Sequence, residues 1–282
     1  MSRNDDERIK NICNFLKGKI PFQPVIAIVG GSGAAKLIDM FTDPIIIPYS
    51  DIPSFPVSTV PGHLGNLVCG ELNGKKVILM QGRVHLYEGI GAKEITLPIR
   101  VLKLLGIEAL FLTNAAGSIN KKMKMGDFCI VKDHINMPSL SGTNPLMGPN
   151  NDEYGPRFPS MTGAYDKKLR AKAKEVAKQL GIQDRVHEGV YSCQAGPAFE
   201  TPSELKFFAA VGCDLIGMST AHEVIVARHM GVRCFCLSLV SNECVMDVDE
   251  EREPNHEEVL QTGKDRSAQL NAFIAAMVAD YV

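Results

Sequence analysis

Short apolar runs alternate along the chain with longer segments whose apolar residues recur at helical spacing. The short runs have the length of buried strands, and the longer segments have the pattern of amphipathic helices. The predicted strands are residues 25–29, 67–72, 77–81, 109–113, 128–132, 186–193, 215–218 and 234–240. The predicted helices are a first helix within residues 1–19, then 34–41, 93–105, 166–180, 202–211, 221–230 and 254–278. This alternation predicts an α/β fold, a layered domain with a central sheet flanked by helices.

The connections predict one domain with a mixed sheet. Asn73-Gly74 stands between two predicted strands and is a hairpin signal, so at least one strand pair is expected to be antiparallel. No repeat, low-complexity tract or linker divides the chain, and we expect residues 1–282 to form a single domain. Residues 134–162 are rich in Pro, Gly, Asn and Ser, and a connection of this length predicts a functional loop.

Composition narrows the classes of function. Of the 282 residues, 45% are hydrophobic and 22% are charged, as in a globular protein with a large core. The formal net charge of −2 provides no general field for a polyanion, which argues against nucleic acid and anionic membranes as partners. The N-terminal segment lacks the apolar centre of a signal peptide, and no apolar stretch is long enough to span a bilayer.

The number and spacing of the cysteines and histidines indicate a reducing compartment and argue against a metal site. The eight cysteines form no CxxC pair, and the seven histidines are scattered along the chain. Reduced thiols are therefore expected, and no zinc site or disulfide framework. These features predict a cytoplasmic protein.

The segment after the predicted strand 77–81 carries the most informative side chains. If the backbone stays extended, Arg83, His85 and Tyr87 lie on one face, because side chains alternate along a strand. A guanidinium beside an imidazole suits a phosphate, and the phenol can hydrogen-bond a sugar. The alternative is a polar strand end whose arginine pairs with a carboxylate.

A second candidate anion site is the glycine-rich turn 30–33, which contains Ser32 and joins a predicted strand to a predicted helix. Backbone N–H groups at a helix start attract an anion, although a turn without a ligand is the alternative. The known glycine fingerprints fail here. Lys36 stands where a dinucleotide-binding turn needs glycine, and Ala34 where a nucleophile elbow needs it.

Polar and aromatic residues follow further predicted strands. Phe199 and Glu200 offer a stacking face and a carboxylate acceptor, which suit a heterocycle with N–H donors. The alternative is that Glu200 or Thr201 only caps the next helix. Asn242 ends the last predicted strand and can both donate and accept hydrogen bonds. His256 lies in the first turn of the last predicted helix, where an isolated histidine is usually a surface residue.

Together these motifs resemble the trimeric, low-molecular-mass class of purine nucleoside phosphorylases. The matching segments occur in the same order over nearly the whole chain, at 31–33, 61–66, 82–89, 114–120, 134–136, 155–159, 196–200, 217–223, 242 and 256. The resemblance implies a pentosyltransferase of purine salvage that cleaves purine (deoxy)ribonucleosides with inorganic phosphate, giving free base and (deoxy)ribose 1-phosphate. Phosphate is then a co-substrate, and no metal or other cofactor is implied.

The resemblance also implies a role for each matching residue. Phosphate contacts are implied for Ser32, His63, Arg83, His85, Ala115 and Ser219. Nucleoside contacts are implied for Tyr87, Phe158, Phe199, Glu200, Gly217, Met218, Asn242 and His256. The implied catalytic residues are His85, Glu200, Asn242 and His256. Phe158 would close the sugar site of a neighbouring subunit, so a homotrimer is expected. Glu200 would accept from N1–H and favour 6-oxopurine nucleosides such as inosine and guanosine.

Three departures from the family pattern leave the base preference open. Ala221-His222 replaces Val-Pro, Glu243 stands where lysine is usual, and Ser118 replaces a common glycine. The choice between 6-oxopurines, 6-aminopurines and even pyrimidines stays open on these residues.

Other interpretations make different predictions. A methylthioadenosine phosphorylase is expected to have Asp in place of Asn242 and an apolar 5′ pocket in place of His256. A non-catalytic nucleoside-binding paralogue would bind nucleosides without turnover. It would not need all of Arg83, His85, Glu200 and Asn242 together. A nucleosidase that uses water needs no anion site, and a dinucleotide-dependent oxidoreductase would have the glycine fingerprint that is missing here.

Overall fold

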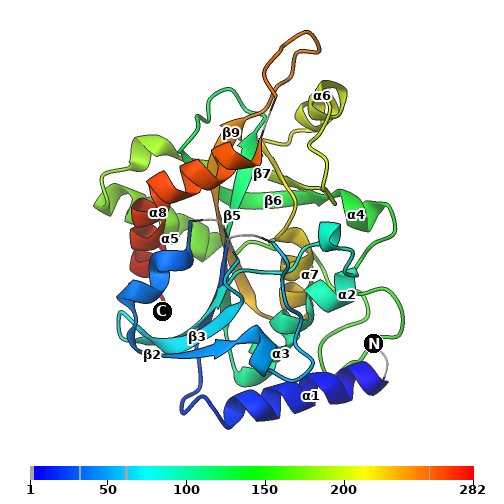
Figure 1. The fold of residues 1–282 in the computed structure, drawn as a ribbon, viewed down its shortest axis with the longest axis vertical. Coiled ribbons are helices and arrows are strands. Elements are labelled where there is room, and N and C mark those ends of the chain that lie inside the picture. The colour runs from blue at the N-terminus through cyan, green and yellow to red at the C-terminus, as the bar shows by residue number, and fades with distance from the viewer. Residues whose placement is uncertain (1–2, 32, 61–62, 254) are drawn as a thin grey trace.

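The computed structural model describes residues 3–31, 33–60, 63–253 and 255–282, and it shows a large sheet with helices on both faces (Figure 1). Within these residues the strands are β1 (Ile26–Gly30), β2 (Thr42–Pro48), β3 (Asn66–Leu72), β4 (Lys75–Gln81), β5 (Ala109–Ser118), β6 (Phe128–Asn136), β7 (Val186–Cys193), β8 (Leu215–Gly217) and β9 (Arg233–Glu243). The α-helices are α1 (Arg3–Lys17), α2 (Ala92–Ile95), α3 (Leu97–Leu105), α4 (Met137–Leu140), α5 (Lys167–Gln179), α6 (Pro202–Ala210), α7 (Ala221–His229) and α8 (His256–Ala279). Short 3-10 turns are η1 (Ala35–Met40), η2 (Tyr49–Asp51), η3 (Leu86–Glu88) and η4 (Gln183–Arg185).

The sheet is mixed, as predicted. Its strand order is β2-β3-β4-β1-β5-β8-β7-β6-β9, and β9 also pairs with β5, so that the second part of the sheet closes on itself. β1 runs parallel to β4 and β5, whereas β3 is antiparallel to β2 and β4. Asn73-Gly74 forms the β3–β4 turn with φ angles of 48° and 78°, the positive values that a two-residue hairpin turn requires. The α/β class and the hairpin are thus confirmed.

Different helices cover the two faces of the sheet because strand side chains alternate in direction. In β1, Ala27 and Val29 join the core with α1, α3 and α7, whereas Ile26 and Ile28 join the core with α5 and α8. The amphipathic first helix is confirmed as α1, which packs on α3. No described helix is both long and apolar enough to cross a bilayer.

Two early segments differ from the prediction. The edge strand β2 was not expected, because Asp43 and Pro44 interrupt its apolar pattern and most of its side chains are not buried. Residues 34–41 contain a 3-10 turn in place of the expected α-helix, and 93–105 divides into α2 and α3, with Pro98 in the first turn of α3.

Of the later strands, β5, β6 and β9 are longer than the apolar runs that predicted them. β5 continues beyond residue 113 and β6 beyond residue 132, because ladder hydrogen bonds tolerate the polar and small residues that follow. The expected loop 134–162 therefore begins with the end of β6 and the short α4. Pro254, expected in the first turn of the last helix, lies outside the described residues.

Candidate active site

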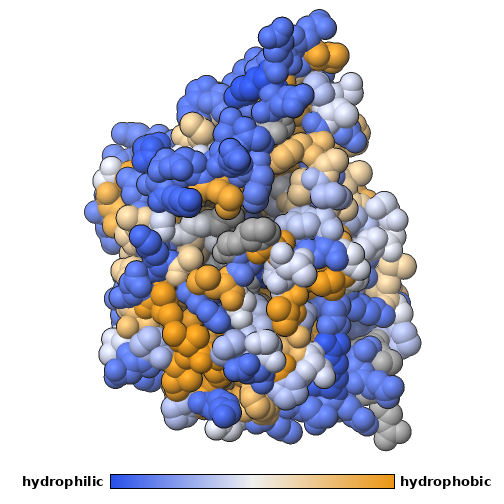
Figure 2. Space-filling model, viewed as in Figure 1, coloured by the Kyte–Doolittle hydropathy of each residue, from blue (hydrophilic) through white to orange (hydrophobic). Residues whose placement is uncertain are grey.

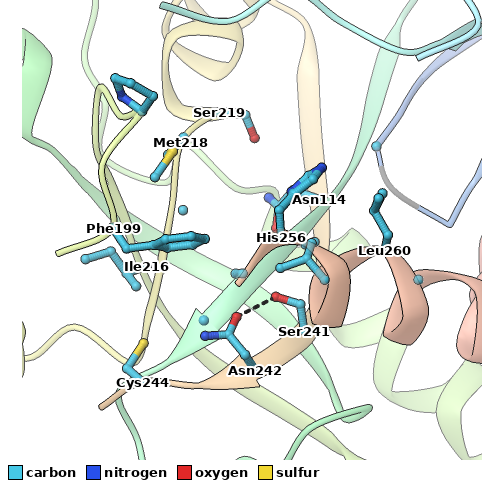
Figure 3. A pocket seen from close by; sticks show the side chains of 18 of the residues that line it. Asn114, Phe199, Ile216, Met218, Ser219, Ser241, Asn242, Cys244, His256 and Leu260 are labelled. Carbon is cyan, nitrogen blue, oxygen red and sulfur yellow. Dashed lines mark hydrogen bonds between the residues drawn. The ribbon is translucent and has the colours of Figure 1, made fainter. Parts of the chain in front are cut away.

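A cavity of about 970 Å³ lies where the ends of several strands meet the start of α8 (Figure 3). Parallel strands present their carboxyl ends at one edge of a sheet. Residues that follow β1 and β4 line this cavity, together with residues from the carboxyl-terminal parts of β5 and β9. Of the fourteen site residues expected from the sequence, twelve line it: His63, Arg83, His85, Tyr87, Ala115, Phe199, Glu200, Gly217, Met218, Ser219, Asn242 and His256. Ser32 lies outside the described residues, and Phe158 is not on the cavity wall.

The chain between β4 and α2 does not stay extended, so the expected alternation of three side chains on one strand face is wrong. Gly82 has a φ of 104°, and the chain then turns into η3. Only glycine adopts this backbone region readily, and a Cβ there would lie 2.7 Å from the His63 Cβ. The turn nevertheless brings His85 and Tyr87 to the cavity, where their rings stack with centroids 4.6 Å apart.

Arg83 is buried at one end of the cavity and pairs with a carboxylate. Its Nη1 donates to Glu223 Oε2 at 2.7 Å and to Thr220 Oγ1 at 3.2 Å, and its Nη2 donates to the Thr113 carbonyl. Burial raises the pKa of Glu223. The guanidinium also borders the glycine-rich turn, since a Cβ on Gly31 would lie 3.2 Å from Arg83 Nη2. The arginine thus has the carboxylate partner of the alternative interpretation, and it also lines the cavity.

Two histidines lie beside this arginine, and Glu88 holds one of them, His85. The Glu88 carboxylate accepts from the His85 backbone N–H at 2.7 Å and from the Thr59 backbone N–H at 2.6 Å, and His85 Nδ1 lies 3.2 Å from it. Burial, with the nearby Arg83 charge, lowers the pKa of His85 to about 3. Burial also lowers the pKa of His63. His85 is therefore neutral at physiological pH, with Nδ1–H directed to Glu88 and Nε2 left as an acceptor.

The middle of the cavity is formed by backbone and small side chains from β5 and from the β8–α7 connection. Ala115 lies in β5, and Ser219 follows β8, with Met218 beside it (Figure 3). Asn114 Nδ2 donates to Thr220 Oγ1 at 2.8 Å, which ties the two segments together. Thr220 has a φ of 73°, a strained conformation for a β-branched residue and one that is often found at functional sites.

The opposite end of the cavity combines an aromatic ring, an amide and a carboxylate. Phe199 projects into the space beside Asn242 (Figure 3). Ser241 Oγ donates to Asn242 Oδ1 at 2.8 Å, so the amide oxygen is occupied and the Nδ2 donor remains for a ligand. Burial raises the pKa of Glu200. The helix cap expected for this region is Thr201, not Glu200, and it accepts from the Glu204 backbone N–H at 3.3 Å.

The structure places the departures from the family pattern outside this end of the cavity. Glu243 Oε2 is 3.3 Å from Lys124 Nζ, and the Glu243 side chain is not on the cavity wall. His222 is buried behind the site, with Nδ1 3.9 Å from Cys193 Sγ. Ser118 Oγ donates to the Asn120 carbonyl. None of the three lines the cavity.

His256 and Phe158 are the last two residues expected from the sequence, and one lines the cavity whereas the other does not. His256 is the first residue of α8, whose N-cap Asn255 accepts from the Glu258 backbone N–H at 2.9 Å. Phe158 is 88% exposed on the segment between α4 and α5. Residues 244–253, between β9 and α8, project from the molecule at the top of the view and are mostly hydrophilic (Figure 2).

Sequence reasoning missed several residues of the site. Glu88 had a recognisable signal, because it stands three residues after His85 as in a capping box. Ser241 and Cys244 flank the expected Asn242 but carry no signal of their own, and Lys36 and Lys264 reach the cavity only through tertiary packing. In the described part of the chain, no three His, Cys, Asp or Glu side chains are grouped so as to hold a metal ion.

Comparison with known proteins identifies the family. The family model described as the phosphorylase superfamily matches residues 25–279. The purine nucleoside phosphorylase of Bos taurus is 47% identical over 91% of this chain and 89% of the relative, and purine nucleoside phosphorylase 1 of Bacillus subtilis (strain 168) is 45% identical over 98% and 99%. The crystal structure of a Schistosoma purine nucleoside phosphorylase with hypoxanthine matches with a TM-score of 0.95 and 44% identity over 98% of both chains. The resemblance seen in the sequence is thus confirmed, and the chain belongs to the purine nucleoside phosphorylases of the phosphorylase superfamily.

Proposed function

We propose that this chain catalyses the reversible phosphorolysis of purine ribo- and deoxyribonucleosides. The observation that carries this proposal is one cavity with two chemically different ends. At one end lie Arg83 and two histidines, and at the other lie Phe199, Glu200 and Asn242. Related solved structures contain inosine, guanosine and, in a Schistosoma mansoni isoform 2, cytosine with ribose-1-phosphate.

The first end suits phosphate. Arg83 supplies the cation, with His85 and His63 beside it. Ser219 and Ala115, in the adjoining middle of the cavity, add a hydroxyl and a backbone group. A phosphate held here lies next to the sugar, where its negative charge stabilises the positive charge that develops at C1′. A phosphate oxygen forms the new bond to C1′ as the C1′–N9 bond breaks, and that electron pair leaves with the purine. We assign Ser32 to the same contacts on the basis of the family resemblance.

The second end suits the departing purine. Asn242 Nδ2 is free to donate to N7 or O6, where negative charge develops on the base. The Glu200 carboxylate accepts from N1–H, which 6-oxopurines have and adenine lacks. Tyr87, Met218 and Gly217 lie between the two ends and are assigned to the sugar, and His256 to its 5′-hydroxyl.

A panel of nucleosides incubated with and without phosphate tests the proposed reaction. Inosine and guanosine should release base only with phosphate, and each free base should be matched by one sugar 1-phosphate. Release without phosphate would identify a nucleosidase, and binding without turnover a non-catalytic paralogue. Preference for methylthioadenosine would identify the closest alternative within the superfamily. The inactive control is Arg83→Met.

We also propose that the active form is a homotrimer in which Phe158 completes a neighbour's sugar site. Its exposure, with Arg157 Cζ 5.5 Å from its ring centroid, supports this role. Sedimentation should give three times the mass of one chain. Phe158→Ala should raise the KM for inosine, and trimers reassembled from mixed Phe158→Ala and Arg83→Met chains should recover activity. A fully active monomer, or no recovery on mixing, would contradict this arrangement.

We further propose that residues 1–282 fold as one domain that acts in the cytoplasm without a metal or organic cofactor. One sheet links the first described strand to the last, and all eight cysteines are free thiols, as is usual in a reducing compartment. A chelator should leave the rate unchanged, and cell fractionation should find the activity in the cytosol.

A further inference from the structure

A second, smaller cavity of about 50 Å³ lies where α1, α2 and α3 meet the segment 145–154 and the end of α7. It shares no lining residue with the candidate active site. A water needs about 10–15 Å³ of such space, so this cavity holds a few waters or one small ion and is too small for a nucleoside.

One wall of this cavity is a buried arginine that has no hydrogen-bond acceptor in the described part of the chain. Arg100 is 8% exposed, and its Cζ lies 5.6 Å from the centroid of the Tyr154 ring. Its guanidinium has five N–H donors, yet it makes no hydrogen bond or ion pair among the residues that the structure describes. Burial lowers the pKa of Arg100. A buried charge without a hydrogen-bonded partner is costly, so this site favours a ligand that supplies one.

The neighbouring charges leave a positive excess. Glu94 lies on the wall but is occupied by Arg8, whose Nη1 donates to Glu94 Oε2 at 2.7 Å. Lys93 stands at the same wall, with its Nζ 3.2 Å from where a Cβ on Gly148 would lie. Asp5 is the other carboxylate of the lining, and its charge acts on Arg100 without a hydrogen bond to it. Three cationic side chains of the lining thus face two carboxylates.

We propose that this cavity binds a small inorganic oxyanion of the phosphate class, held by Arg100 and Lys93. The planar fork of a guanidinium matches two oxygens of a tetrahedral anion, and the lysine adds a second positive charge at the mouth. This site is separate from the proposed phosphate co-substrate site, and its test does not depend on turnover.

Equilibrium binding of radiolabelled phosphate to the full chain tests the proposal. The wild type should have a phosphate-binding site whose affinity does not change in Arg83→Met. Arg100→Met should weaken binding at that site at least about tenfold, because a hydrogen-bonded charge is lost. Lys93→Met, at an exposed position that folding tolerates, should weaken it about 2- to 5-fold. Lys103→Met on the same helix as Arg100 is the matched control and should change nothing.

The location is checked in crystals of Arg83→Met soaked with selenate, where an anomalous peak is expected beside the Arg100 guanidinium. The proposal is overturned if Arg83→Met binds no phosphate. It is also overturned if neither Arg100→Met nor Lys93→Met changes the affinity of the site that remains in Arg83→Met. A cavity that holds only waters in the selenate map overturns it as well. Failure of the proposed catalytic function would give a different result. Arg83→Met would then bind as many phosphates per chain as the wild type.

Discussion

At the scale of single residues, the hydrogen bonds within the protein decide which atoms at the base end of the cavity remain for a ligand. The Asn242 oxygen accepts from Ser241 Oγ, and the Ser241 carbonyl in turn accepts from Thr262 Oγ1 at 3.1 Å. The amide therefore offers a donor and Glu200 offers an acceptor, the pattern that complements a 6-oxopurine. Since Glu243 pairs with Lys124 away from the cavity, the unusual residue beside Asn242 does not change this pattern.

Replacement of Glu200 by Gln should lower kcat/KM for inosine roughly ten- to hundred-fold, because a hydrogen bond to a charged group contributes about 1.5–3 kcal/mol. Glu243→Gln, a loss of the same charge in a surface ion pair, is the control and should change kcat/KM little. Equal effects of the two substitutions, or an unchanged inosine rate, would refute the role of Glu200.

The same carboxyl predicts a pH dependence. Burial raises the pKa of Glu200 above its usual 4.5, so the carboxyl becomes protonated, and loses its negative charge, at a higher pH than a free glutamate. The wild-type kcat/KM for inosine should fall on the acid side as this group is protonated. In Glu200→Gln that acid limb should be absent, and its persistence would assign it to another group.

Ser241→Ala should release the Asn242 amide and allow it to rotate. We expect kcat/KM for inosine to fall about 2- to 10-fold, the cost of one neutral hydrogen bond, while the rate with adenosine falls less. The inosine-to-adenosine ratio is therefore the informative measurement. A proportional loss with both substrates would show that Ser241 supports the fold and does not orient the amide.

At the scale of elements, short connections after strand ends carry the site, and helix caps hold those connections in place. The loop with Phe199 and Glu200 leads directly into α6, whose N-cap Thr201 and third residue Glu204 form a reciprocal capping box. The η3 turn is held in the same way, by Glu88 and the His85 backbone. Both caps are recognisable in the sequence, but the cavity that they border is not.

Thr201→Ala should therefore destabilise the protein by about 1 kcal/mol through loss of the cap. Denaturant unfolding of the two proteins measures this difference, and Ser203→Ala, an exposed change in the same first turn of α6, is the control. A larger loss in the control would show that helix propensity, and not capping, dominates at this end.

At the scale of the whole molecule, the burial of histidines couples stability to pH. Burial lowers the pKa of five of the seven histidines, which are His63, His85, His134, His222 and His229. The unfolded chain therefore binds more protons than the folded one below about pH 6.5. The stability that these groups contribute is complete above that pH and is lost as the pH falls toward their folded values.

His222 gives the sharpest test, because burial lowers its pKa to about 4 and it does not line the cavity. Between pH 7 and pH 5 the wild type should lose about 2 kcal/mol of unfolding free energy through this residue alone. His222→Gln should remove that part of the loss, as measured by urea unfolding at both pH values. The same pH dependence in the variant would show that His222 is not protonated on unfolding.

The sequence by itself determined the fold class, because buried strands and helix starts are local patterns. Local residue patterns and the family resemblance together predicted twelve residues that line the cavity. It did not reveal β2, whose exposed edge position tolerates Asp43 and Pro44, nor the bend at Gly82 that ends the extended segment. Only the tertiary structure decided that Arg83 meets Glu223, 140 residues away, and that Ser241 orients Asn242. It also decided that Arg100 is buried with no hydrogen-bond acceptor among the described residues. These contacts join segments that are distant in the chain or depend on side-chain direction, and both follow from how the layers pack.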